Sequence, residues 1–153
     1  MQPTTRLATN GDLEVLAQFQ RNLVEYERPM DSTIAVDADG YYDIESLLTD
    51  PDTHLLVAED AGSLSGCSFG QIRPADHWAA HERIGYIGMV YVHDDYRGRG
   101  ICSMMFERLE AWFRSRAVHE LRLEAYARNP SAHKAYLKSG FEPHLIQMRR
   151  SLE

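Results

Sequence analysis

Apolar residues recur every three or four positions in several segments of the chain, and this spacing predicts amphipathic helices. The first helix follows a capping residue at Asn10 or Asp12 and ends at Pro29, whose ring cannot continue it. A longer helix runs from about Arg99 to Ala117, with its apolar positions at helical spacing. Helices are also predicted from Tyr41 to Leu48 and over residues 129–140.

Alternating or continuous apolar runs bounded by turn residues predict strands. The run HLLVAED (54–60) is followed by Ala61–Gly62 and then by SLSGCSFGQIR (63–73), an arrangement that predicts a hairpin. RIGYIGMVYV (83–92) is predicted to be a buried strand. The remaining strands are predicted over residues 4–9, over 120–127, and in the tail FEPHLIQMRRSL, as a final strand or strand pair.

The order of these elements is β-α-α-β-β-β-α-β-α-β, which indicates an α/β or α+β fold with a mixed sheet. A chain of 153 residues suits one domain, so we predict a single domain over residues 1–153. No apolar run approaches the ~18 residues that a membrane span needs. The first 25 residues also lack a hydrophobic signal core, so a cytoplasmic location is expected.

Composition narrows the class of protein further. Hydrophobic residues make up 44% and charged residues 25%, which argues against a disordered or low-complexity chain. Two cysteines, Cys67 and Cys102, are too few and too far apart for a disulfide framework or a zinc finger. The net charge of −7 disfavours nucleic-acid binding. Residues 1–80 hold 4 Lys/Arg and 14 Asp/Glu, whereas residues 81–153 hold 12 and 9, so an anionic ligand would suit the second half.

The stretch VYVHDDYRGRGICSMMF (90–106) joins a buried strand to a helix through a glycine-rich turn. The first amides of a helix lack partners inside it, so a diphosphate could lie against them where Gly98 and Gly100 leave the backbone uncovered. The phosphate loop of NTPases needs a Lys-Ser/Thr pair that is absent here. The dinucleotide fingerprint lacks its third glycine, although Glu124 lies where an acidic ribose partner would be. A third pattern, [Q/R]-x-x-G-x-[G/A], is matched by Arg97, Gly100 and, imperfectly, Cys102.

Two blocks in this half of the chain together resemble the GNAT superfamily of acyl-CoA-dependent N-acyltransferases. The first is YRGRGICSMMFERLEAWF, and the second is NPSAHKAYLKSGF, which matches the pattern N-x-x-A-x-x-x-Y-x-x-x-G-F at every fixed position. The resemblance covers residues 54–150 well and residues 1–53 only in element order. It implies a mixed, mostly antiparallel central sheet flanked by helices. Cys102 departs from the family's usual Gly or Ala.

The resemblance implies that acetyl-CoA, or another short acyl-CoA, lies between the strands 83–92 and 120–127. The backbone around Val90 and Val92 would pair with the pantetheine arm, and one amide would polarise the thioester carbonyl. Asn129 would bind the pantetheine, and Tyr136 would protonate the departing thiolate. The implied cofactor-binding residues are Val90, Tyr91, Val92, Arg97, Gly98, Arg99, Gly100, Ile101, Cys102, Ser103 and Asn129.

The acyl acceptor would be the primary amine of a small molecule or peptide. A lysine-like amine must lose a proton at a cost of roughly 4.6 kcal/mol at pH 7. Tyr86, Glu82 and His81 are candidate bases, and ordered water is an alternative. Carboxylates and aromatic rings gather in the segment from residue 25 to 43, and they suit a cationic amine. From that segment Glu27, Tyr41 and Tyr42 are predicted to bind the acceptor.

Other functions remain open at this point. A catalytically silent acyl-CoA-binding or sensing module would explain the same glycine-rich turn, and a dinucleotide-binding protein is a third interpretation. His77 and His81 lie four residues apart but have no third ligand nearby, so no metal is predicted. A homodimer is expected only by analogy with the resembled family.

Overall fold

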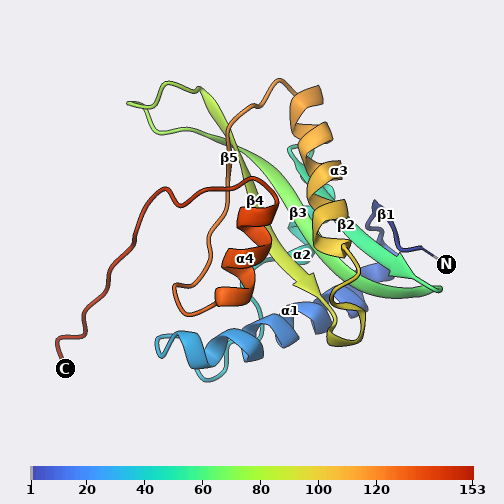
Figure 1. The fold of residues 1–153 in the computed structure, drawn as a ribbon, viewed down its shortest axis with the longest axis horizontal. Helices are drawn as coiled ribbons and strands as arrows, with labels where there is room; N and C mark the ends of the chain where they lie inside the picture. Colours follow the sequence, from blue (N-terminus) through green and yellow to red (C-terminus); the bar gives the residue numbers. More distant parts are fainter. Residues whose placement is uncertain (1) are drawn as a thin grey trace.

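The computed structural model describes residues 2–153, which form one five-stranded sheet flanked by helices (Figure 1). The strands are β1 (Thr4–Leu7), β2 (Thr53–Asp60), β3 (Ser63–Pro74), β4 (Arg83–Val92) and β5 (Leu121–Arg122), and they lie in this order across the sheet. The first four pair antiparallel, and only β5 runs parallel to β4. The predicted fold class is therefore confirmed, and the sheet lacks the parallel core of a dinucleotide-binding fold.

Helices cover both faces of this sheet, since the central strands are apolar on both sides. The helices are α1 (Leu13–Glu27), α2 (Ile44–Thr49), α3 (Ile101–Ser115) and α4 (Pro130–Lys138). In β2, Leu55 and Val57 pack with α1 and α2, whereas Leu56 and Ala58 pack with α3. This alternation with period two produces two separate cores, one on each face. Figure 1 shows α3 and α4 together on the near face of the sheet.

Glycines in the central strands let α3 approach the sheet closely. A Cβ at Gly85 would lie 2.6 Å from the Phe113 ring of α3, and a Cβ at Gly70 would lie 2.7 Å from the same ring. Phe113 is fully buried, so it has little room to move aside. Gly70 and Gly85 therefore fix the position of α3 and hence of its N-terminus.

A β-bulge bends β4 just before its end. Phe69 of β3 pairs with Gly88 and Cys67 with Tyr91, so β4 carries one more residue than β3 across this interval. Met89, a buried non-glycine residue, has a φ of 50° there. Because a bulge strengthens the local twist, β4 turns away from the segment that follows β5. Figure 1 shows the two segments diverging toward the end of β4.

Two of the predicted strands differ from the structure. Instead of a strand over 120–127, β5 has two residues, which pair with Gly85 and Tyr86 of β4. Beyond that point the divergence of β4 removes the partner that a longer strand would need. The predicted final strand or strand pair in the tail is wrong for the described chain, because residues 142–153 are extended and exposed but pair with no strand.

Candidate active site

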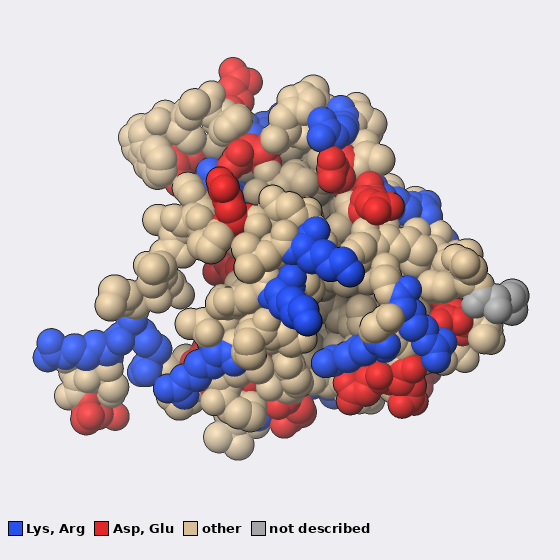
Figure 2. Space-filling view, in the orientation of Figure 1, with Lys and Arg blue, Asp and Glu red and all other residues tan. Residues whose placement is uncertain are grey.

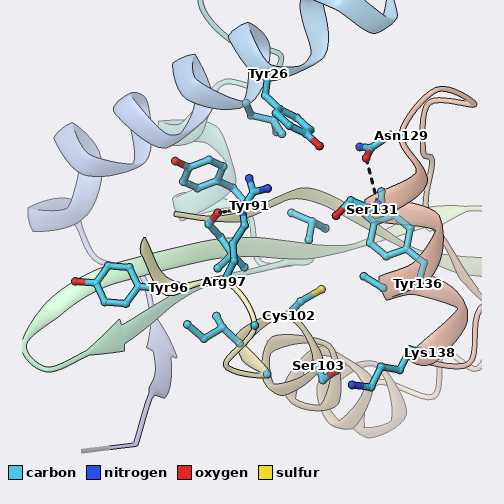
Figure 3. A pocket seen from close by; sticks show the side chains of 18 of the residues that line it. Tyr26, Tyr91, Tyr96, Arg97, Cys102, Ser103, Asn129, Ser131, Tyr136 and Lys138 are labelled. Atoms are coloured by element: carbon cyan, nitrogen blue, oxygen red, sulfur yellow. Dashed lines mark hydrogen bonds between the residues drawn. The ribbon is translucent and has the colours of Figure 1, made fainter. Parts of the chain in front are cut away.

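A pocket of about 290 Å³ lies where β4 and β5 separate. On the side of β4 that faces β5, the backbone from Ile87 to Val92 has no strand partner within the described chain. The walls come from α1, from the end of β4 and the turn after it, from the first turn of α3, and from the length of α4 (Figure 3). Of the predicted cofactor-binding residues, those lining it are Val90, Tyr91, Val92, Arg97, Gly98, Gly100, Ile101, Cys102, Ser103 and Asn129.

The N-terminus of α3 presents free amides to this pocket. Gly100 is the N-cap residue, and no side chain caps the helix there. The first helical hydrogen bond runs from the Met104 amide to the Gly100 carbonyl at 3.0 Å, so the amides before Met104 have no helical partner. Gly98 and Gly100 have φ values of 77° and 76°, and nothing lies within 4 Å of a Cβ built at either. The turn is therefore an open, electropositive cradle for an anion.

The two arginines of this turn have different surroundings. Arg97 lines the pocket, where its Nε donates to the Val92 carbonyl at 3.2 Å. Arg99 does not line the pocket, because its guanidinium binds the buried Asp60 carboxylate at 2.8 Å. Lys138 of α4 lines the opposite wall. Figure 2 shows Lys and Arg side chains around a hollow between α4 and the start of α3, as an anionic ligand would require.

Alternation along β4 divides its last residues between the two faces of the sheet. Val90 and Val92 pack toward α3 and α4. Tyr91 belongs to the other core, where its ring lies 4.8 Å from Phe19 and its hydroxyl accepts a hydrogen bond of 3.1 Å from Asn22. The backbone of this segment, rather than the Tyr91 hydroxyl, is thus available to a ligand lying along the edge.

Tyr136 of α4 and Asn129, the residue that caps the start of this helix, both line the pocket. The ring of Tyr136 packs against Phe106 and Phe141, with centroids 5.7 and 6.4 Å away. Burial, followed by the nearby Cys102 thiol, raises the pKa of Tyr136, so the phenol is protonated at neutral pH. Asn129 caps α4 by accepting a hydrogen bond of 3.1 Å from the Ala132 amide, while its Nδ2 has no partner within the described chain.

Comparison with known proteins decides what kind of protein has this pocket. The sequence model of the acetyltransferase (GNAT) family matches residues 17–141. The chain belongs to this family. It is an acyl-CoA-dependent acetyltransferase, and the dinucleotide-binding interpretation is set aside.

Solved structures share the fold of this acetyltransferase at low sequence identity. A mutant of the BH1408 protein from Bacillus halodurans has a TM-score of 0.88 at 19% identity, covering 98% of this chain and 99% of its own. A predicted acetyltransferase from Clostridium acetobutylicum, solved with acetyl-CoA, has a TM-score of 0.76 at 21% identity, covering 99% and 97%. An aminoglycoside antibiotic 6'-N-acetyltransferase from Acinetobacter haemolyticus has a TM-score of 0.71 at 15% identity, covering 98% and 99%. No curated protein matched the chain.

One carboxylate of the acetyltransferase lines the pocket, at the end of α1. This is Glu27, whose pKa is raised by burial and by the charge of Asp31, while the nearby Tyr41 hydroxyl acts in the opposite direction. Tyr126 donates a hydrogen bond of 2.7 Å to Asp31, and burial with this bond raises the pKa of Tyr126 to about 12. Acidic and phenolic groups from α1, from the loop after it and from the segment after β5 therefore gather beside the pocket.

The other predicted acceptor and base residues lie outside the pocket lining. The hydroxyls of Tyr42 and Tyr86 are 3.1 Å apart, and the Arg73 guanidinium lies 3.8 Å from the centroid of the Tyr86 ring. Burial, then the Tyr42 hydroxyl, raises the pKa of Tyr86. Glu82 is exposed just before β4 begins, at the opposite end of that strand from the pocket. His81 lies there too, 3.8 Å from the Glu120 carboxylate.

Several lining residues of the acetyltransferase were not identified from sequence. On α4, Ser131, Ala135 and Lys138 are spaced so as to share one helix face, and this spacing could have indicated them once Asn129 was chosen. Tyr26 of α1 belongs to the segment from residue 25 to 43 that was expected to suit a cationic amine, but nothing in the sequence placed it beside Asn129, which lies 103 positions later. Figure 3 shows Tyr26 and Asn129 on facing sides of the pocket.

Within residues 2–153, no cluster of three or more His, Cys, Asp or Glu side chains is placed to hold a metal ion. None of the described helices combines the length and the apolar character needed to cross a membrane.

Proposed function

We propose that this acetyltransferase moves the acetyl group of acetyl-CoA directly to a primary amine of a small molecule or peptide, within a single catalytic domain. The observation that carries the proposal is the continuity of one pocket. It joins the open amides at the start of α3, the unpaired edge of β4 and the Tyr136 phenol. Two solved neighbours, one holding acetyl-CoA and one that is an aminoglycoside acetyltransferase, support the choice of donor and acceptor class.

The donor would be held along its length by backbone groups. The amides from Gly98 to Ser103 would bind the diphosphate, assisted by the Arg97 and Lys138 charges. The pantetheine arm would pair with the free edge of β4 as an added strand does, reaching the Nδ2 of Asn129. The thioester would then lie near the bulge at Met89, where a β4 amide can stabilise the negative charge that develops on its carbonyl oxygen.

Tyr136 would act as the general acid for the leaving thiolate. Its raised pKa keeps the proton on the phenol at neutral pH. Complete transfer to a thiolate would be uphill by ~2 kcal/mol even at the reference pKa values of phenol and thiol, and burial adds to this. A hydrogen bond donated to sulfur as its charge develops is therefore the main contribution expected of Tyr136.

The acceptor would enter from the side of Glu27. Its carboxylate would bind the ammonium group of the incoming amine and take up a proton before the neutral nitrogen attacks the thioester. A glutamate whose pKa is raised by burial is a better proton acceptor than an exposed one. Tyr41 and Asp31 border the same recess and favour a cationic acceptor.

The decisive experiment combines binding and turnover measurements. Amines of each class are screened with acetyl-CoA while released thiol is measured, and turnover separates an enzyme from a silent acyl-CoA sensor. Tyr136→Phe should then lower kcat by roughly 10²-fold while the Kd for acetyl-CoA stays nearly unchanged. The ring and its packing on Phe106 remain in this variant, so an unchanged kcat would remove Tyr136 from the mechanism.

A further inference from the structure

A buried carboxylate that the proposed chemistry does not use lies at the end of β2. The side chain of Asp60 is only 4% exposed, although the turn at Ala61–Gly62 follows it directly. Because a carboxylate is costly to remove from water, a buried one is normally paired with a cation or with several hydrogen bonds. The cation here is Arg99, whose Nη1 donates to the Oδ2 of Asp60 at 2.8 Å. Asp60 therefore ties β2 to the turn that precedes α3.

Arg99 lies between the two glycines of the anion cradle. Gly98 and Gly100 both have a positive φ, and glycine has a wider choice of backbone conformations than any other residue. Both also border open space, so packing does not restrain them. The side chain of Arg99 does restrain this backbone, because it binds Asp60 and also approaches the Asp95 carbonyl, 3.5 Å from its Nη2.

The hairpin of β2 and β3 also holds the other end of this turn. The turn begins at His93, whose amide donates to the Ser65 carbonyl of β3 at 2.8 Å. Asp60 and Ser65 both lie at the end of the hairpin where β2 passes into β3. The turn is therefore fixed at two points to one piece of the sheet, and the second point, Arg99, lies among the amides that form the cradle.

We propose that Asp60 is a positioning residue for the donor, which acts through Arg99 to hold residues 98–100 with their amides presented to the diphosphate of acetyl-CoA. Neither Asp60 nor Arg99 lines the pocket, so the pair acts on the backbone of the turn. The inference rests on the proposed place of the diphosphate, and it adds that the cradle is ordered before the donor arrives. Without the ion pair, binding would have to order the turn. Fixing the backbone of one residue corresponds to a roughly 10-fold loss of affinity.

Asp60→Ala tests the proposal, and Asp12→Ala is its matched control. The Asp12 side chain is 8% exposed and binds Arg6 at 2.8 Å, but it lies at the opposite end of α1 from the pocket. Urea unfolding should show that both variants are less stable than the unaltered chain. Isothermal titration should show roughly 10-fold weaker acetyl-CoA binding for Asp60→Ala alone. Acetyl-pantetheine, which lacks the diphosphate, should bind both variants as it binds the unaltered chain.

The sign of the effect separates positioning from simple electrostatics. Removing a negative charge near the cradle would by itself strengthen the binding of an anion. Unchanged or tighter acetyl-CoA binding by Asp60→Ala therefore overturns the proposal. Weaker binding of acetyl-pantetheine also overturns it, because the effect would then not be confined to the diphosphate.

A double variant separates anchoring from direct contact with the ligand. Arg99→Gln by itself would leave the Asp60 carboxylate buried without its cation, and this should destabilise the fold severely. Asp60→Ala combined with Arg99→Gln removes both charges and avoids this problem. The double variant should bind acetyl-CoA as Asp60→Ala does. A further 10-fold loss overturns the proposal, because Arg99 would then bind the diphosphate itself.

Nuclear magnetic resonance tests the anchor without any ligand. The backbone order parameters of Gly98 and Gly100 should be near the rigid value of about 0.85 in the unaltered chain and in Asp12→Ala. In Asp60→Ala they should fall below about 0.6. Unchanged order parameters overturn this inference and leave the proposed donor site standing. If Gly100→Ala binds acetyl-CoA as tightly as the unaltered chain, the donor site itself is wrong, and this inference fails with it.

Discussion

Gly100→Ala is the sharpest test of the anion cradle at the start of α3. Gly100 has a φ of 76°, and an L-residue in this left-handed region costs roughly 1–2 kcal/mol. Its Cβ would stand in open space beside the amides proposed to bind the diphosphate. Losing a charge-assisted hydrogen bond costs about 1.5–3 kcal/mol, which corresponds to roughly 10- to 150-fold weaker binding. The substitution should therefore reduce both stability and acetyl-CoA affinity.

Gly62→Ala provides a matched control for the strain. Gly62 has a φ of 83° in the turn between β2 and β3, and nothing lies within 4 Å of a Cβ there either. Urea unfolding should show similar destabilisation in both variants. Isothermal titration should show weaker acetyl-CoA binding only for Gly100→Ala. Acetyl-pantetheine, which lacks the diphosphate, should bind both variants equally. Equal acetyl-CoA affinities in the two variants would refute the assignment of the diphosphate to these amides.

Two other predictions concern the acceptor and the core. Because its pKa is raised, Glu27 becomes protonated at a higher pH than an ordinary glutamate as the pH falls. Glu27→Gln removes this proton acceptor, so the acidic limb of the kcat/KM profile should move toward the pKa of the amine itself. The exposed Glu25→Gln should leave the pH profile unchanged, and identical profiles for both variants would count against Glu27. Gly85→Ala should lower the free energy of unfolding by about 1–3 kcal/mol, because its Cβ would overlap the immobile Phe113 ring. Denaturant unfolding measures this, and an unaffected midpoint would show that α3 can shift.

Features that depend on neighbouring residues were predictable from the sequence. The turn with Gly98 and Gly100, the helix that begins after it, and the Asn129-Pro130 start of α4 each follow from local backbone preferences. The antiparallel hairpin of β2 and β3 follows from two apolar runs joined by Ala61–Gly62. Such signals are contained within a few residues, so no knowledge of tertiary contacts was needed to find them.

Which side chains reach the pocket was decided by tertiary structure. Arg97 and Arg99 are equivalent in sequence, but only the second meets Asp60, a residue of β2 that lies 39 positions earlier. Glu27 comes beside Tyr136 because α1 and α4 pack around the end of β4, and the bulge at Met89 sets the direction of that end. The sequence of the tail, residues 142–153, predicts a strand, but in the structure the tail pairs with no strand of the described chain. Strand pairing also requires a free sheet edge nearby, which the sequence pattern of one segment does not specify.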